Sequence, residues 1–205
     1  MNYLFINTAE GTRALLCVNG KRFYDENLKN SGSETLMPMI DGLINRASVS
    51  VRDIDVFGVC TGPGSFTGLR IGITTVKTLC YALDKPCFAV NNLRLNSYNN
   101  KSDKVISVAD AGNKVCYLAR YDGENEIMPA ACVSIDDAKK LIVENPDYAV
   151  STDVKLSDVF LGNAGVGENE MARAAEKYIT AVAAQSELVP LYVRKAQPER
   201  SAGDL

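Results

Sequence analysis

The feature that most constrains the fold of this chain is a strand–loop–helix–strand succession. A buried strand is followed by a glycine-rich loop, a helix and a second strand. The apolar run Val56–Cys60 predicts the first strand, and residues 61–68 form the glycine-rich loop. An apolar stripe over residues 69–83 predicts the helix, which must end before Pro86 because proline lacks an N–H group. Cys87–Val90 predicts the second strand. Such a succession forms a right-handed parallel crossover, so the sequence predicts an α/β fold.

The residues before this crossover predict a meander and a helix. An apolar run at 2–6 and a second run at 13–18 predict two strands, and the tight-turn signal Asn19-Gly20 predicts that residues 21–26 return as a third, antiparallel strand. Apolar residues then recur at helical spacing over 36–44. Ser33 is the expected N-cap of this helix, with Glu34 in its first turn, and Pro38 predicts a late start or a kink.

The second half of the chain is expected to form a smaller lobe. The polar stretch Asn91–Asp103 contains five asparagines and predicts a boundary between lobes at residues 1–97 and 98–205. Elements are expected as a hairpin over 105–108 and 115–120, a helix over 135–143, strands over 148–150 and 159–161, and a helix over 169–184. The meander-then-crossover order does not clearly repeat, and the tail after Tyr192 is expected to fray.

Composition excludes several classes of function. The 205 residues include 22 Lys and Arg against 25 Asp and Glu, a net charge of −3, which argues against a freestanding nucleic-acid binder. No apolar run approaches the roughly 20 residues of a membrane helix, and the first ten residues lack a signal-peptide pattern. We therefore expect a cytoplasmic protein. The six cysteines form no CxxC pair and are expected to be reduced and buried.

The sequence contains no histidine. This removes Ser-His-Asp and Cys-His catalysis and every metal site that needs an imidazole, including that of a histidine-ligated metallopeptidase. An enzyme made from this chain alone would depend on carboxylates, lysine or a cofactor.

The glycine loop allows three interpretations. Its place between a strand and a helix is typical of phosphate-binding loops. However, Thr67 stands where a dinucleotide loop has its third glycine, and no Gly-Lys-Ser/Thr follows. The loop therefore serves as a tight turn capped by Ser65 or Thr67, as an anion site, or as a partner contact. Gly68 and Gly72 flatten one helix face, which predicts close approach of another element within the chain or between chains.

The stretch Thr61-Gly-Pro-Gly-Ser-Phe-Thr-Gly-Leu-Arg-Ile-Gly72 resembles the signature of the TsaB (YeaZ) family of tRNA-modification proteins. Residues 6–9, 33–40, 110–111 and 190–194 are similar to further motifs of that family. The resemblance implies an actin-like ATPase (ASKHA) fold of two lobes, the second reduced. It also implies a non-catalytic scaffold for threonylcarbamoylation of adenosine 37 in tRNA.

The same resemblance implies partners and an interface. Members dimerise and bind the catalytic subunit TsaD, and the ATPase TsaE joins them, so that ATP and metal belong to partner subunits and tRNA is bound through the complex. Contacts in the family use the two helices of the N-terminal lobe. The residues expected at this interface are Leu36, Met37, Ile40, Gly68, Gly72 and Val76. Gly72→Leu is then expected to block partner binding and to leave the monomer folded.

Three positions depart from the family pattern. Asn7 replaces an aspartate near the nucleotide's metal, Gly32 replaces a histidine, and Gly112 replaces an arginine. No cofactor site is therefore expected, and Asn7, Gly64 and Gly162 are only relic candidates. The alternative is an ATPase or phosphotransferase with its own nucleotide site, for which residues 162–167 form a second glycine loop.

Overall fold

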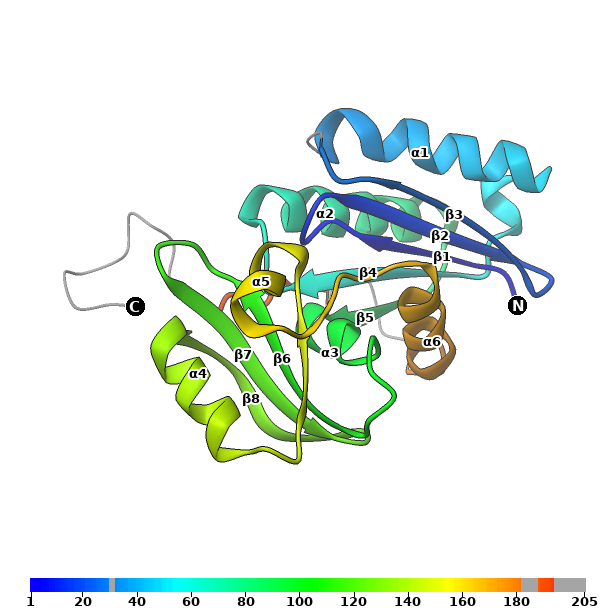
Figure 1. Cartoon of the computed structure of the whole chain (residues 1–205). Helices are drawn as coiled ribbons and strands as arrows, with labels where there is room; N and C mark the ends of the chain where they lie inside the picture. The colour runs from blue at the N-terminus through cyan, green and yellow to red at the C-terminus, as the bar shows by residue number, and fades with distance from the viewer. Residues whose placement is uncertain (30–31, 182–187, 194–205) are drawn as a thin grey trace. The chain divides into compact units, whose positions relative to one another are not determined.

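The first half of the chain forms a five-stranded mixed sheet. The computed structural model describes residues 1–29, 32–181 and 188–193 (Figure 1). The strands of this sheet are β1 (Tyr3–Asn7), β2 (Thr12–Val18), β3 (Lys21–Asn27), β4 (Val56–Gly62) and β5 (Cys87–Asn91). They lie in the order β3-β2-β1-β4-β5, with β1 to β3 antiparallel and β4 and β5 parallel to β1. The predicted meander and crossover are confirmed.

Three helices cover this sheet. Figure 1 shows α1 (Gly32–Ala47) and α2 (Phe66–Leu83) over one face and α6 (Glu168–Tyr178) over the other. The core between the sheet and the first two helices is apolar, and its most buried side chains include Leu4, Ile6, Leu16, Leu36, Leu43, Phe57, Val59 and Val76. The predicted late start of α1 is wrong, because the helix begins at Gly32 with Ser33 already inside it and Pro38 in its interior.

The outer strand β3 is tied to α1 by charged side chains. The Arg46 guanidinium donates a hydrogen bond of 2.9 Å to the Tyr24 carbonyl and lies 3.8 Å from the Asp25 carboxylate. The Glu26 N–H donates to the Asp25 carboxylate at 2.9 Å. Backbone groups of this outer strand are thus bonded to side chains of the same chain.

The chain divides into two compact units, residues 1–92 with 167–190, and residues 93–166 with the chain from 191 onward. The second unit contains β6 (Lys104–Asp110), β7 (Val115–Asp122), β8 (Asn125–Ser134), β9 (Ala149–Thr152) and β10 (Asn163–Ala164). Its helices are α4 (Ile135–Glu144) and α5 (Ser157–Phe160). The helix α3 (Asn92–Ser97) begins at the point of the sequence where the chain passes from the first unit to the second. Short 3₁₀ turns lie at Val51–Asp53 and Val154–Leu156.

The second sheet repeats the strand order of the first. It reads β8-β7-β6-β9-β10, with an antiparallel meander followed by strands parallel to β6. The expectation that this order does not repeat is therefore wrong. The repeat was hidden because its crossover helix α5 has four residues and its last strand has two. The strand predicted over 159–161 is also wrong, since α5 ends at Phe160.

One buried arginine organises the second unit. Arg94 donates 2.8 Å to the Gly123 carbonyl and 2.6 Å to the Glu124 carboxylate, which joins α3 to the β7–β8 turn. Its guanidinium lies 5.2 Å from the Tyr98 ring centroid and 4.6 Å from that of Tyr121. Guanidinium groups over aromatic faces are attracted by the ring quadrupole.

The helix predicted over 169–184 is observed to Tyr178, and residues 182–184 lie outside the described part of the chain, as does the tail from 194. Within the described part, no helix is both long and apolar enough to cross a membrane.

Candidate functional site

The resemblance places a nucleotide's metal at the turn after β1. In this chain the side-chain amide at that turn is hydrogen-bonded to other groups of the chain. Asn7 is 1% exposed, and its Oδ1 accepts the Ala9 N–H at 2.9 Å. Its Nδ2 donates to Asn92 Oδ1 at 3.5 Å, and Asn92 Nδ2 donates in turn to the Pro63 carbonyl at 3.1 Å. Asn7 therefore joins the first turn to the start of α3 and, through Asn92, to the glycine loop. This is a structural role for a neutral amide, which ligates Mg²⁺ poorly.

The glycine loop packs directly on this turn. The Ser65 N–H donates to the Ala9 carbonyl at 2.8 Å, and a Cβ on Gly64 would lie 2.6 Å from the same oxygen. Ser65 is the N-cap of α2, and its hydroxyl accepts the Gly68 N–H at 3.2 Å, which confirms the capped-turn interpretation. Two amides that an anion site would use are therefore bonded within the chain.

Gly68 and Gly72 allow α2 to rest on Thr8. A Cβ on Gly68 would collide with the Thr8 carbonyl oxygen, and one on Gly72 would collide with the Thr8 hydroxyl. The close approach predicted from these glycines is thus a contact within the chain. The structure argues against a folded Gly72→Leu monomer: the new side chain would have to enter space that Thr8 fills, so this variant is now expected to destabilise the fold.

The Cys60 thiol lies under the same turn and remains protonated. It donates to Asn92 Oδ1 at 3.7 Å, and complete burial raises its pKa to about 12. A thiolate is the nucleophilic form of cysteine, so this environment makes Cys60 inert.

The second glycine loop is built into the sheet of the second unit. A Cβ on Gly162 would lie 2.8 Å from the Val150 carbonyl, and Asn163–Ala164 form β10 beside β9. Asn163 Nδ2 donates to the Asn99 carbonyl and to Asn100 Oδ1, both at 2.9 Å. The small side chain at Gly162 thus permits strand packing, which gives this glycine a role without a phosphate.

A buried carboxylate lies at the end of β9. Asp153 is 4% exposed and accepts the N–H groups of Asp110, at 2.6 Å, and Leu156, at 2.9 Å. Burial raises the pKa of Asp153, and the charge of Asp110 acts in the same direction. Both oxygens accept backbone N–H groups, one from the end of β6 and one from the turn after β9, so this carboxylate is a structural acceptor.

Most of the predicted interface lies inside the core. Leu36, Ile40 and Val76 are at most 2% exposed and belong to the apolar cluster beneath α1 and α2. Met37 is 54% exposed and lies at the surface. Met37 is therefore the one member of the predicted set whose side chain is open to a partner.

An open groove lies between the outer faces of α1 and α2. It encloses about 530 Å³ and is lined by Met37, Arg70, Ile71, Thr74, Thr75, Thr78 and Leu79. The α2 residues form two adjacent rows at four-residue spacing, which are the ridges that pack into the grooves of another helix. Sequence reasoning missed these positions because it followed the apolar stripe, which marks the buried face. The outward rows could be found as the polar and threonine-rich positions between them.

Comparison with known proteins identifies the family. The family model of TsaD, tRNA N6-adenosine threonylcarbamoyltransferase, matches residues 26–184. The TsaB protein of Bacillus subtilis, named for tRNA threonylcarbamoyladenosine biosynthesis, is 33% identical over 123 residues, which are 57% of this chain and 54% of that protein. A tRNA N6-adenosine threonylcarbamoyltransferase of Kosmotoga olearia is 39% identical over 97 residues, 47% of this chain and 28% of that protein. The chain thus matches about half the length of the first of these relatives and less of the second.

The solved structure of YeaZ from Pseudomonas aeruginosa shares the fold. It has a TM-score of 0.74 at 21% identity and covers 93% of this chain and 99% of its own. The predicted α/β fold is confirmed by the two mixed sheets with their helices, and the chain shares this fold with the YeaZ structure. The match over more than half of its length shows that the chain belongs to the family described as TsaD, tRNA N6-adenosine threonylcarbamoyltransferase.

Proposed function

We propose that this chain is a non-catalytic subunit of tRNA threonylcarbamoyladenosine biosynthesis that binds the catalytic subunit TsaD through the α1/α2 groove. The observation that carries the proposal is the contrast between the two sides of α2. Its inner side is closed on Thr8, and its outer side lines an open groove.

The residue types of the chain favour a non-catalytic role. The sequence has no histidine, and the first turn presents an amide that is bonded within the chain. Among the described residues, no group of three His, Cys, Asp or Glu side chains could hold a metal ion. In this proposal the transfer reaction and its metal belong to TsaD, and the ATP belongs to a partner ATPase such as TsaE.

The groove has the composition of a helix-docking surface. Met37, Ile71 and Leu79 supply apolar contact. The three threonine side chains of the lining are small, so they leave room for an approaching helix, and they offer hydroxyl groups for hydrogen bonds. Small residues let two helix backbones approach closely, and aromatic and arginine side chains commonly anchor interfaces. Arg70, stacked 4.0 Å from the Phe66 ring centroid, stands at one end of the groove. Because the chain carries a net charge of −3, we propose that TsaD makes most of the contacts to tRNA.

The docking proposal predicts that Thr75→Arg weakens binding to the TsaD of the same organism by at least about a hundredfold, because a long charged side chain would fill the groove. Thr180→Arg is the matched control, since Thr180 is exposed and lies away from the groove lining. Light scattering and titration calorimetry on the wild type and both variants measure the effect. Equal affinity of the two variants would contradict the proposal.

The alternative, a nucleotide site in this chain, has its own test. Because the Ser65 and Gly68 N–H groups are already bonded, the isolated chain is expected to bind Mg-ATP no tighter than in the millimolar range. Calorimetry with Mg-ATP checks this directly. Micromolar binding that Asn7→Ala removes would favour an ATPase or phosphotransferase.

A further inference from the structure

One side of α2 carries aromatic and basic side chains in a single line, which we call the α2 flank. Aromatic rings that are 43% and 80% exposed stand at its two ends, and two cations lie between them; in chain order the four residues are Phe66, Arg70, Lys77 and Tyr81. At about 100° per residue they lie within about 60° of the helix circumference, and fifteen residues of helix make the line about 22 Å long. The helix ends just past this line, where the charges of Asp84 and Lys85 offset each other.

The α2 flank is separate from the groove that α2 forms with α1. On α2 the groove is lined by the row Ile71, Thr75 and Leu79, which lies at the opposite border of the exposed surface of the helix. Lys77 and Tyr81 do not line the groove, so the flank faces away from α1. A helix seated in the groove would therefore leave these two side chains accessible.

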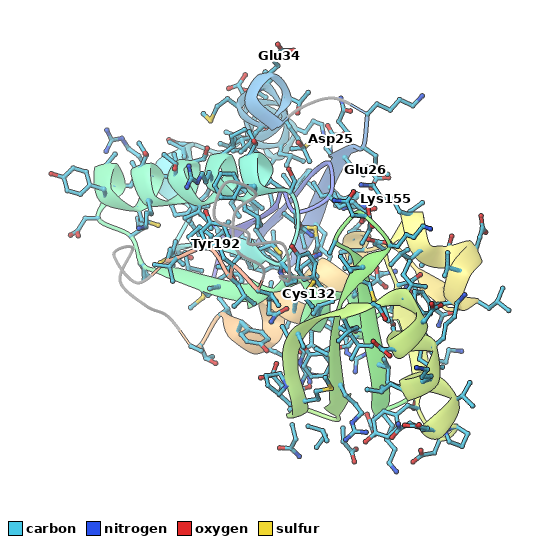
Figure 2. The ribbon with its side chains drawn as sticks, turned by 90° about the vertical axis from the view of Figure 1, so that its left-hand side faces the viewer. Asp25, Glu26, Glu34, Cys132, Lys155 and Tyr192 are labelled. Atoms are coloured by element: carbon cyan, nitrogen blue, oxygen red, sulfur yellow. The ribbon has the colours of Figure 1, made fainter. Side chains whose placement is uncertain are left out.

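The flank concentrates positive charge on a chain that is acidic as a whole. Arg70 and Lys77 are the only charged residues of α2, so no carboxylate of this helix offsets them. The neighbouring helix α1 instead exposes Glu34 and Asp41, and Figure 2 shows Glu34 on the outer side of that helix. A polyanion is therefore attracted to the flank of α2 and repelled by the outer face of α1.

We infer that the α2 flank binds RNA, and that in the proposed complex it contacts an unpaired segment of the tRNA. This inference rests on the proposed function, which supplies the tRNA. Arginine and lysine side chains contact phosphate groups, and exposed aromatic rings stack on unpaired bases. The Arg70 guanidinium already lies 4.0 Å from the centroid of the Phe66 ring, so each of these two groups holds the other in place before RNA binds.

The order of residue types along the flank favours RNA over a protein partner. Protein interfaces have an apolar centre with a polar rim, and they are depleted in lysine. The flank has the reverse arrangement, with its rings at the ends and its cations at the centre, while the aliphatic side chains Ile71 and Leu79 line the groove. Because the flank has only two cations, it adds to the tRNA contacts of TsaD and does not replace them.

The salt dependence of tRNA binding tests the phosphate contact. A fluorescently labelled, unmodified tRNA transcript is titrated with the complex of this chain and TsaD at several KCl concentrations, and anisotropy gives the dissociation constant. Lys77→Gln should weaken binding about threefold to tenfold and lower the slope of log K against log salt by about one. Lys101→Gln makes the same charge change at an exposed lysine of the second unit and should alter the affinity by less than about twofold.

Two substitutions of Tyr81 test the stacking contact. Tyr81→Leu keeps an apolar side chain but removes the ring, so it should weaken tRNA binding about fivefold or more and leave the salt slope unchanged. Tyr81→Phe keeps the ring and should bind tRNA to within about twofold of wild type. Since this side chain is 80% exposed, neither change should lower the Tm, and thermal unfolding checks that both variants are folded.

The outcomes separate this inference from the docking proposal. Equal affinity and salt slope for Lys77→Gln and Lys101→Gln would overturn the inference, and so would wild-type tRNA binding by Tyr81→Leu. Calorimetry without tRNA measures TsaD binding, and if Lys77→Gln or Tyr81→Leu weakened that step, the flank would be a protein contact and the inference would be wrong. If the wild-type chain did not bind TsaD, the docking proposal would fail, and the same titrations with the chain alone at low salt would decide the inference by the same contrasts.

Discussion

Gly68→Ala is expected to lower the free energy of unfolding by about 2–3 kcal/mol, although alanine favours helices more than glycine does. The added methyl group would collide with the Thr8 carbonyl oxygen, which belongs to the backbone of a buried turn and cannot rotate away. Gly72→Ala should also destabilise the fold, but there the collision is with the Thr8 hydroxyl. Chemical denaturation of the three proteins measures both effects.

Two controls make the interpretation specific. Thr8→Ala removes the hydroxyl and should relieve Gly72→Ala in the double variant, while leaving the backbone collision of Gly68→Ala in place. Gly42→Ala in α1 meets nothing within 4 Å and should stabilise the chain by about 0.5–1 kcal/mol through helix propensity. If Thr8→Ala relieved both glycine variants equally, the proposed contact of α2 with the Thr8 backbone would be wrong.

Arg94→Met is expected to destabilise the second unit by about 3 kcal/mol, because it removes two hydrogen bonds and two ring contacts of a buried guanidinium. The β7–β8 turn would lose its connection to α3. Hydrogen exchange of amides in this turn and in α3 is the appropriate measurement, since it separates the second unit from the first.

Arg94→Lys distinguishes geometry from charge. A lysine ammonium keeps the charge but lacks the planar fork that reaches the Gly123 carbonyl and the Glu124 carboxylate together. We expect most of the destabilisation to remain in this variant. Lys101→Met, at an exposed lysine of the same unit, should change stability by less than about 0.5 kcal/mol. Wild-type protection in Arg94→Lys would mean that the positive charge alone is sufficient.

The crossover and the first meander could be predicted from sequence because their signals are local. Val56–Cys60 and Cys87–Val90 are short apolar runs bounded by glycine and proline, and Asn19-Gly20 specifies a tight turn. The strands of the second sheet are harder to predict from sequence. β8 has mostly exposed or half-buried side chains, and β10 has two residues, so neither shows a periodic pattern. Their places follow from pairing with distant strands, which no local window contains.

In the candidate site, too, local features could be predicted from the sequence and contacts between distant residues could not. That Ser65 caps α2 could be predicted from its position before the helix. The partner of Gly68 and Gly72 could not, because the spacing of two glycines predicts a close approach but does not name the approaching element. The structure identifies Thr8, some sixty residues earlier in the chain. Leu36, Ile40 and Val76 of the predicted interface lie in the core for a related reason, since an apolar stripe marks the face that the chain buries itself.

The bonds on β3 bear on how this chain avoids unwanted assembly. An outer strand offers a row of N–H and C=O groups to which any extended chain can add, and such addition leads to aggregation. Here the Arg46 guanidinium donates a hydrogen bond to the Tyr24 carbonyl, and the Asp25 carboxylate accepts one from the Glu26 N–H. Charged side chains thus bond to backbone groups that an added strand would otherwise use. Recognition of partners is left to the helix surfaces, where side-chain shape and charge can discriminate between them.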